Sequence, residues 1–319
     1  MKRNRSLSAC PTAQESVAGG VYFIFQLVLL PSILRWVNAQ LSQPLTQTEL
    51  NFTYYLINFL ATILIYHEFL GRSARQATQH VAYFCQAVVL GLAAYYACNF
   101  LTLRLIRLLV PGFTNYNDAV ISAMSRSGRY LMVVSTVILV PPAEECVFRG
   151  LIFRGYKKSG SAFWAILLSS ALFGLMHLNV NQAIYAFVIG ILLALLVEAT
   201  GSLWTSVFCH VVFNSSQVCL MFLSSRLLAP SLENAVAEAE AAVTPEILIM
   251  GMCVYLVVAT ITTPLAFCVL AWIAGNEGRK ETLREIWRRR KEKKEYLVSI
   301  PLLLAVVICV ACISIELIF

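Results

Sequence analysis

Long apolar runs recur through most of this chain of 319 residues, and they restrict its possible folds more than any other feature. The runs are long enough to cross the hydrocarbon core of a membrane, which is roughly 30 Å thick. We expect helices, because a chain in lipid must satisfy its own backbone hydrogen bonds and these runs lack the alternation of barrel strands. The expected spans are residues 17–37, 51–70, 81–106, 130–157, 161–178, 183–200, 203–223, 246–274 and 299–318.

The composition supports the same class of protein. Hydrophobic residues make up 59% of the chain and charged residues only 13%, whereas a soluble domain is about half apolar and about a quarter charged. The sequence therefore predicts an all-α, polytopic helical membrane protein with eight or nine transmembrane helices. It excludes an ordinary soluble domain.

The distribution of basic residues predicts the orientation in the membrane. Lys2, Arg3 and Arg5 precede the first run and place the N-terminus in the cytoplasm. Residues 276–296 contain nine Lys or Arg and five Glu, which predicts an amphipathic helix on the inner leaflet, where anionic lipids attract it. A single basic helix beside a membrane does not indicate nucleic-acid binding. The pattern suits an integral protein of a bacterial plasma membrane, surrounded by membrane lipids.

Three blocks follow one another along the chain. Residues 1–129 are expected to form three transmembrane helices with few ionisable side chains at depth. Residues 130–223 are expected to form four closely spaced helices that carry the chemically interesting polar residues, and residues 224–319 add two helices joined by the basic connection. A functional site is therefore expected in the middle block, in a cavity of the helix bundle.

An acidic pair followed by an arginine lies in the fourth run. Glu144, Glu145 and Arg149 are costly at hydrocarbon depth, and a membrane chain retains such groups mainly where they pair or take part in chemistry. On a helix, Glu145 lies four residues before Arg149 and is the better placed to pair with the guanidinium. That pairing leaves the Glu144 carboxylate free to face a site. Pro141 and Pro142, just before the pair, predict a kink or an end of the helix.

Two of the four histidines of the chain fall in the same block. His177 lies four residues after Phe173, and His210 lies four residues before Asn214, so that each pair shares one face of its helix. Carboxylates, an arginine and two histidines on neighbouring apolar helices indicate a hydrolytic site inside a membrane protein.

The patterns Glu-Glu-x-x-x-Arg, Phe-x-x-x-His and His-x-x-x-Asn follow one another on successive expected helices. This set of motifs resembles that of the CPBP intramembrane proteases, also called the Abi or CAAX-protease family, which include the Rce1-type enzymes that trim prenylated proteins. The resemblance covers about residues 130–223.

The resemblance implies a role for each matching residue. Glu144 would be the catalytic glutamate, and His177 would help it to hold and activate a water molecule. His210 and Asn214 would stabilise the oxyanion. The supporting members of the first motif would be Glu145 and Arg149.

The chemistry of peptide hydrolysis agrees with these roles. A base must deprotonate water, and a carboxylate in a poorly hydrated cavity is a stronger base than one in water. Donors from His210 and the Asn214 amide would stabilise the tetrahedral oxyanion, where the loss of one donor costs about 3–4 kcal/mol. On this interpretation the protein is an endopeptidase that needs no cofactor and acts on a membrane-associated peptide or protein substrate.

Two alternatives stay open. Glu144, His177 and His210 could supply a zinc site with a bound water, as in a membrane metallopeptidase, although Asn214 is a poor zinc ligand and fits the metal-free interpretation better. The protein could also be a non-proteolytic membrane scaffold, for example in a bacteriocin-immunity system. A transporter would show paired broken helices, and only one Pro-broken polar helix is evident in the motif block. The substrate is not identified by the sequence.

Overall fold

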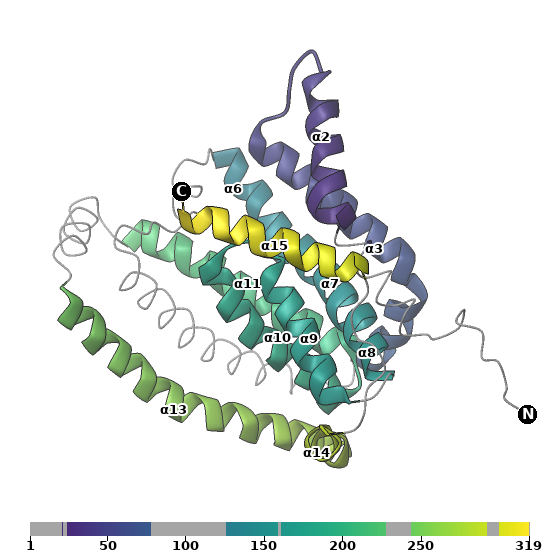
Figure 1. The fold of residues 1–319 in the computed structure, drawn as a ribbon, viewed down its shortest axis with the longest axis vertical. Helices are drawn as coiled ribbons and strands as arrows, with labels where there is room; N and C mark the ends of the chain where they lie inside the picture. Colours follow the sequence, from purple (N-terminus) through teal and green to yellow (C-terminus); the bar gives the residue numbers. More distant parts are fainter. Residues whose placement is uncertain are drawn as a thin grey trace, which may run out of the picture.

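The computed structural model of the chain describes residue 21 and residues 24–77, 126–158, 161–227, 244–291 and 300–318. Within these ranges all regular structure is helical and no strand occurs, which confirms the predicted all-α class (Figure 1). The expected span 81–106 lies outside the described residues.

The described helices follow the order of the expected spans. Two helical stretches, Tyr130–Lys158 and Gln182–Thr200, are long and apolar enough to cross a membrane by their length and composition. The total of eight or nine transmembrane helices therefore stays a prediction. The segments, with π-helical ones marked η, are η1 (Phe25–Leu29), α2 (Leu30–Ala39), α3 (Gln47–Ala77), α6 (Arg126–Val133), η2 (Val134–Leu139), α7 (Val140–Glu145), η3 (Cys146–Phe153), α8 (Arg154–Lys158), α9 (Ala162–Leu175), α10 (Val180–Thr200), α11 (Leu203–Leu227), α13 (Pro245–Asn276), α14 (Lys280–Arg288) and α15 (Ile300–Ile318).

One uninterrupted helical stretch, Arg126–Lys158, passes through the two prolines that were expected to kink or end it. Pro141 and Pro142 occupy the first turn of α7, where a missing N–H is tolerated. The preceding η2 has a wider turn, in which the Val140 N–H bonds to the Ser135 carbonyl five residues back. The helix therefore does not end at the prolines.

The N-terminus of α3 is closed by a reciprocal cap. The Glu49 N–H donates to Thr46 Oγ1 at 3.4 Å, and Glu49 Oε2 accepts from the Thr46 backbone N–H at 2.9 Å and from its hydroxyl at 2.8 Å. This arrangement satisfies backbone donors that a helix start would otherwise leave open. It fixes the point at which the chain enters α3.

Helices α9 and α10 pack closely because small residues lie between them. A Cβ atom at Gly190 would lie 2.9 Å from the Ser170 Cβ, and a Cβ at Gly174 would lie 2.5 Å from the Ala183 carbonyl oxygen. Small residues at an interface let two helix backbones approach in lipid. A larger side chain at either glycine would push α9 and α10 apart.

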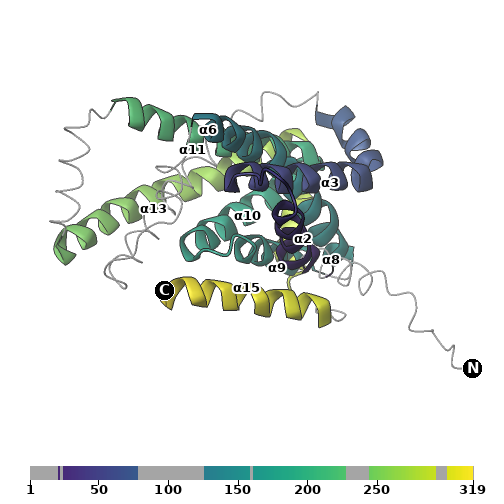
Figure 2. The ribbon, with the colours of Figure 1, turned by 90° about the horizontal axis from the view of Figure 1, so that it is seen from above.

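The apolar core lies where η3, α9, α10 and α11 meet. Its buried side chains include those of Phe148, Phe153, Phe173 and Leu203, and Leu302 of α15 packs into the same cluster. Figure 2 shows α9 and α10 between α15 on one side and α3 and α6 on the other. The middle block of the chain is thus the centre of the described structure.

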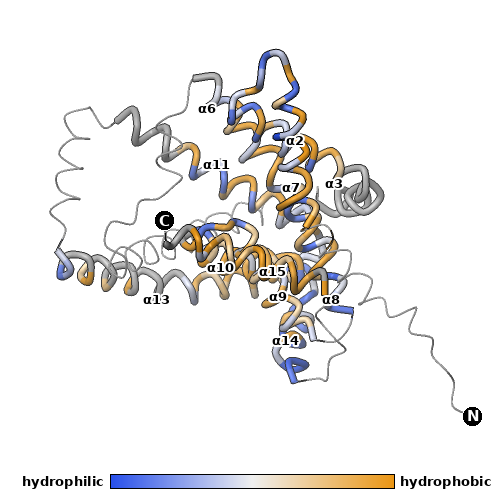
Figure 3. The backbone as a smooth tube through the Cα atoms, turned by 45° about the horizontal axis from the view of Figure 1, so that its top comes forward, coloured by the Kyte–Doolittle hydropathy of each residue, from blue (hydrophilic) through white to orange (hydrophobic). Residues whose placement is uncertain are grey.

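Apolar side chains also cover much of the outside. Ile300, Leu303 and Val307 of α15 are exposed, and Figure 3 shows α15 as hydrophobic along most of its length. Exposed apolar helices of this kind suit a hydrocarbon surrounding better than water. The outer surface therefore agrees with the membrane class inferred from composition.

The basic connection contains the predicted helix, α14, which is docked onto the core. Arg279 Nε donates to the Glu198 carbonyl at 2.8 Å, and the Glu198 carboxylate pairs with Lys157 Nζ at 2.6 Å. Ile286 is buried while Trp287 is exposed. Figure 3 shows hydrophilic positions on α14. Glu198 therefore has a structural role at this end of α10.

Candidate active site

The predicted site residues lie on three helical stretches that meet inside the bundle. The positions are Glu144 and Glu145 on α7, Arg149 on η3, His177 directly after α9, and His210 and Asn214 on α11. The first three share one continuous helix, so their spacing fixes their relative directions. The other three are brought to it only by tertiary packing.

Glu145 and Arg149 form a fully buried ion pair, as their spacing predicts. Arg149 Nη1 donates to Glu145 Oε1 at 2.9 Å, and both side chains are 0% exposed. Arg149 Nη2 donates to the Gly190 carbonyl at 3.2 Å, and its guanidinium lies 4.4 Å from the centroid of the Phe173 ring. A buried charge is tolerated only when it is paired and hydrogen-bonded in this way. The pair thereby ties η3 to α9 and α10.

His210 lies between the two carboxylates. Its Nδ1 donates to Glu145 Oε1 at 3.0 Å, and its Nε2 lies 3.7 Å from Glu144 Oε2. A carboxylate can only accept, so Nδ1 must carry a proton, and this hydrogen bond fixes the orientation of the ring. The imidazole is buried and directs Nε2 toward Glu144. Sequence spacing did not indicate the contact between His210 and Glu145.

Asn214 is held by a carbonyl that a proline leaves free. In the wider turns of η2, hydrogen bonds run five residues back, as from Val140 to Ser135. The next donor in that series would be Pro141, which has no N–H. The Thr136 carbonyl therefore lacks its helical donor, and Asn214 Nδ2 donates to it at 2.8 Å. One N–H of the amide remains for another acceptor.

His177 faces the aromatic ring of its own motif. Its Nδ1 donates to the Phe173 carbonyl at 2.8 Å, which leaves Nε2 as an acceptor in the neutral ring. The Phe173 ring stands edge-to-face against His177, with centroids 5.0 Å apart, and against His210, with centroids 5.7 Å apart. Phe173 thus separates the two histidines. Among the described residues, no hydrogen bond or ion pair joins His177 to Glu144.

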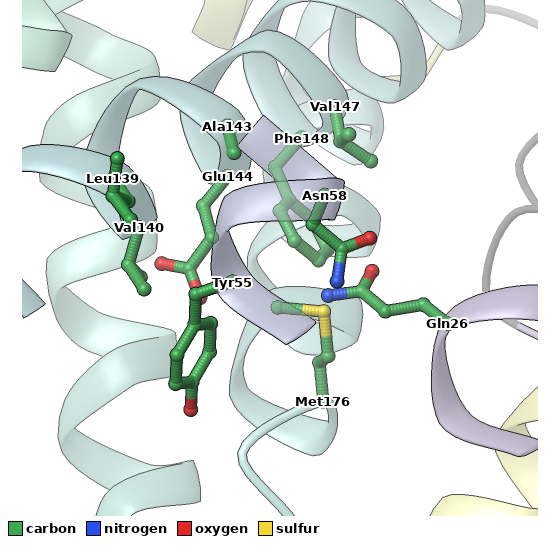
Figure 4. Close-up of a pocket in the computed structure, with 10 residues that line it drawn as sticks. All are labelled: Gln26, Tyr55, Asn58, Leu139, Val140, Ala143, Glu144, Val147, Phe148 and Met176. Atoms are coloured by element: carbon green, nitrogen blue, oxygen red, sulfur yellow. The ribbon is translucent and has the colours of Figure 1, made fainter. Parts of the chain in front are cut away.

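The Glu144 carboxylate faces a pocket. Its Oε2 is buried and has no hydrogen-bond partner among the described residues. The pocket beside it has a cavity volume of about 20 Å³, enough for one water molecule. Figure 4 shows the carboxylate next to the Tyr55 ring, with Leu139 and Val140 nearby. An acceptor of this kind, with space in front of it, can bind a water molecule or a substrate group.

Three pocket residues come from the N-terminal helices and were not predicted as site residues. Gln26 lies on η1, and Tyr55 and Asn58 lie on α3. The only signal for them in the sequence is that Gln26 and Asn58 are polar residues inside apolar runs. Such residues more often serve helix packing, so sequence reasoning alone could not select them.

The alternative zinc ligands do not converge in the described structure. No group of three His, Cys, Asp or Glu side chains in the described ranges is arranged to hold a metal ion. Glu144 and His210 approach each other to 3.7 Å, but among the described residues no hydrogen bond or ion pair joins His177 to either of them. The residues present therefore do not fit a three-ligand zinc site in this arrangement, and we assign no chemical step to a metal.

Two comparisons with known proteins found matches to part of this chain. Residues 126–216 match the family described as type II CAAX prenyl endopeptidase Rce1-like. A protein of Bacillus subtilis (strain 168), named "Putative membrane peptidase YdiL", is 30% identical over 90 residues, which cover 28% of this chain and 37% of that relative. The match therefore spans well under half of either chain. No solved structure matches this chain significantly.

Proposed function

Residues 126–216 belong to the CPBP family of membrane proteases, and on that premise we propose that this protein is an endopeptidase that hydrolyses peptide bonds inside the membrane with a water activated by Glu144. The observation that carries the proposal is Glu144 Oε2, which is buried at the wall of a pocket, makes no hydrogen bond within the described residues, and lies 3.7 Å from His210 Nε2. A base at a sheltered pocket is what water activation requires.

The proposed first step is attack of water on the scissile carbonyl. Glu144 takes one proton from the water while His177 Nε2 accepts the other O–H and orients it. The His210 Nε2–H and the free N–H of Asn214 donate to the developing oxyanion. The carbon–nitrogen bond then breaks, and Glu144 passes its proton to the leaving amine.

Charge balance supports the donor role of His210. Glu145 requires a proton on Nδ1, and donation to an oxyanion requires a second one on Nε2. The proposal therefore requires an imidazolium between the two carboxylates. With Arg149 paired to Glu145, the cluster holds two negative and two positive charges, so it carries no net charge inside the apolar core.

The position of Glu144 in its helix supports a site inside the bilayer. Glu144 is at the midpoint of the 29-residue stretch Tyr130–Lys158. At about 1.5 Å per residue, it lies about 21 Å from either end. We propose an N-terminus in the cytoplasm of a bacterial cell, a membrane-associated peptide or protein as substrate, and no cofactor.

A set of matched variants tests the function. The full chain in lipid vesicles is assayed with a library of quenched-fluorescence apolar peptides. Glu144→Gln should lower kcat by on the order of 10²- to 10⁴-fold, because it removes the base but keeps the shape. Glu281→Gln, an exposed residue on α14, should cleave like the parent. Equal rates for Glu144→Gln and the parent would mean that the protein is not a glutamate-dependent protease and would favour the scaffold alternative.

A further inference from the structure

The pocket at Glu144 has two unlike walls. One wall comes from residues 126–216, and the other comes from Gln26, Tyr55 and Asn58, which lie outside the segment that matches the protease family. Figure 4 shows the side chains of Gln26 and Asn58 directed into the same space, beside Met176. The wall supplied by the N-terminal helices therefore contributes polar groups that the catalytic motifs do not include.

These two amides are buried without partners. Gln26 is 9% exposed and Asn58 is 5% exposed. Gln26 Oε1 and Asn58 Nδ2 have no hydrogen-bond partner among the described residues. Buried polar groups are nearly always hydrogen-bonded, so each exception calls for an explanation. One explanation is a bound molecule that supplies both missing partners.

The backbone holds these amides in place. The Tyr54 hydroxyl donates to the Gln26 carbonyl at 3.2 Å and links η1 to α3. Gln26 lies in the π-helical turn Phe25–Leu29, and such turns are frequent at functional sites. Asn58 is in the interior of α3, one helical turn after Tyr55 and Tyr54. The two side chains are therefore presented from regular, connected helices rather than from a loop.

We propose that Gln26 and Asn58 form a subsite for one peptide group of the substrate, adjacent to the bond that Glu144 hydrolyses. Gln26 Oε1 accepts the backbone N–H, and Asn58 Nδ2 donates to the backbone carbonyl. One acceptor and one donor together complement a peptide group, whereas a phosphate headgroup offers mainly acceptors and a hydrocarbon chain offers neither. This inference rests on the proposed function.

The rest of the pocket defines the substrate class further. Its other lining residues, Glu144 apart, are apolar or aromatic, namely Tyr55, Leu139, Val140, Ala143, Val147, Phe148 and Met176. This lining favours a peptide group that carries an apolar side chain.

The test compares backbone analogues of one substrate. A quenched-fluorescence apolar peptide that the parent cleaves in vesicles is remade with an ester in place of each backbone amide in turn, which removes one N–H at a time. Gln26→Met and Asn58→Leu remove the side-chain amides at similar volume. Gln217→Met is the matched control, because Gln217 Nε2 is also buried without a partner among the described residues but lies outside the pocket lining.

The subsite predicts a specific pattern in the kinetics. Gln26→Met and Asn58→Leu should each raise KM by about 5- to 10-fold, the usual effect of one hydrogen bond, with kcat within about twofold of the parent. Gln217→Met should keep the KM of the parent. One ester position should raise KM in the parent but not in Gln26→Met, because both changes remove the same hydrogen bond.

Three results would overturn the inference. If each ester raises KM by the same factor in the parent and in both variants, the side-chain amides do not contact the substrate backbone. Lower thermal stability together with a uniform loss of kcat would show that Gln26 and Asn58 serve only as a structural pair between η1 and α3. A parent that neither binds nor cleaves any peptide would reject the subsite and the proposed function together.

Binding separates the two proposals. The uncleaved peptide should bind to Glu144→Gln, and addition of Gln26→Met should raise its Kd by about 5- to 10-fold. If Gln26→Met leaves Kd unchanged while cleavage still depends on Glu144, the subsite alone is rejected. Undiminished cleavage by Glu144→Gln rejects the proposed function, whatever the amides do.

Discussion

Replacement of Arg149 by methionine tests the buried ion pair at the centre of the site. Methionine keeps the length of the aliphatic stem but removes the guanidinium. Three interactions are lost: the 2.9 Å contact with Glu145 Oε1, the 3.2 Å hydrogen bond to the Gly190 carbonyl, and the stacking at 4.4 Å on Phe173. The Glu145 carboxylate is then left in the core with His210 as its remaining partner.

The expected loss of stability is about 3–5 kcal/mol, the range for removing one partner of a buried ion pair. The stacking and the hydrogen bond to Gly190 place the expectation in the upper half of that range, since each is worth on the order of 1 kcal/mol. Glu145→Gln combined with Arg149→Met should cost less than the sum of the two single changes, because the double variant leaves no unpaired charge.

The assay is equilibrium unfolding of the purified chain in mixed micelles, followed by helix content and by tryptophan fluorescence. Arg284→Met is the control, because Arg284 pairs with Glu281 on the surface of α14, where both side chains are more than two-thirds exposed. Such an exposed pair should make no measurable difference. If Arg149→Met is as stable as Arg284→Met, the argument that this pair holds the core together is refuted.

Three further predictions follow from individual contacts. Asn214→Leu should lower kcat by on the order of 10²- to 10³-fold with little change in KM, because it removes the proposed oxyanion donor; a change confined to KM would contradict that role. Cleavage should persist in strong chelator, with zinc well below one equivalent by elemental analysis; loss of activity with chelator and its recovery with zinc would favour the metallopeptidase alternative. Glu49 precedes the expected span 51–70, and hydrogen bonds from Thr46 lower its pKa. The cap of α3 should therefore be intact above the ordinary pKa of a glutamate. It should be lost as the pH falls through the lowered pKa of Glu49. Thr46→Ala should raise the pKa of Glu49 in an NMR titration, and an unchanged pKa would show that the cap does not form.

The parts of the site that lie on one helix could be predicted from spacing. Glu145 and Arg149 are four positions apart, so a helix alone brings them together, and in the structure Glu145 Oε1 and Arg149 Nη1 are 2.9 Å apart. The helical runs within the described residues could also be predicted from the sequence, because the length of an apolar run is a local property. The proposed roles of Glu144, His177, His210 and Asn214 remain to be tested.

The contacts between helices could not be predicted from the sequence. Whether His210 meets Glu144, Glu145 or neither depends on the rotation of α11 about its axis, which packing against α7 decides. The hydrogen bond from Asn214 to the Thr136 carbonyl depends on the π-helical form of η2, which the residue pattern does not predict. The prolines were expected to kink or end the helix, but the wide turn before them and their place in the first turn of α7 allow the helix to continue.

Glu145 Oε1 accepts from both Arg149 and His210, and this shared atom links correct packing of the helices to the orientation of the proposed catalytic histidine. A slip of α11 by one residue turns its side chains by about 100° and shifts them by about 1.5 Å, which would withdraw His210 from Glu145. The same slip would disturb the surroundings of the buried ion pair and so destabilise the core. The slipped arrangement is therefore less stable than the native one. Folded molecules accordingly have His210 oriented toward Glu144. The hydrogen bonds at Glu145 Oε1 therefore serve both the stability of the fold and the alignment of the proposed catalytic groups.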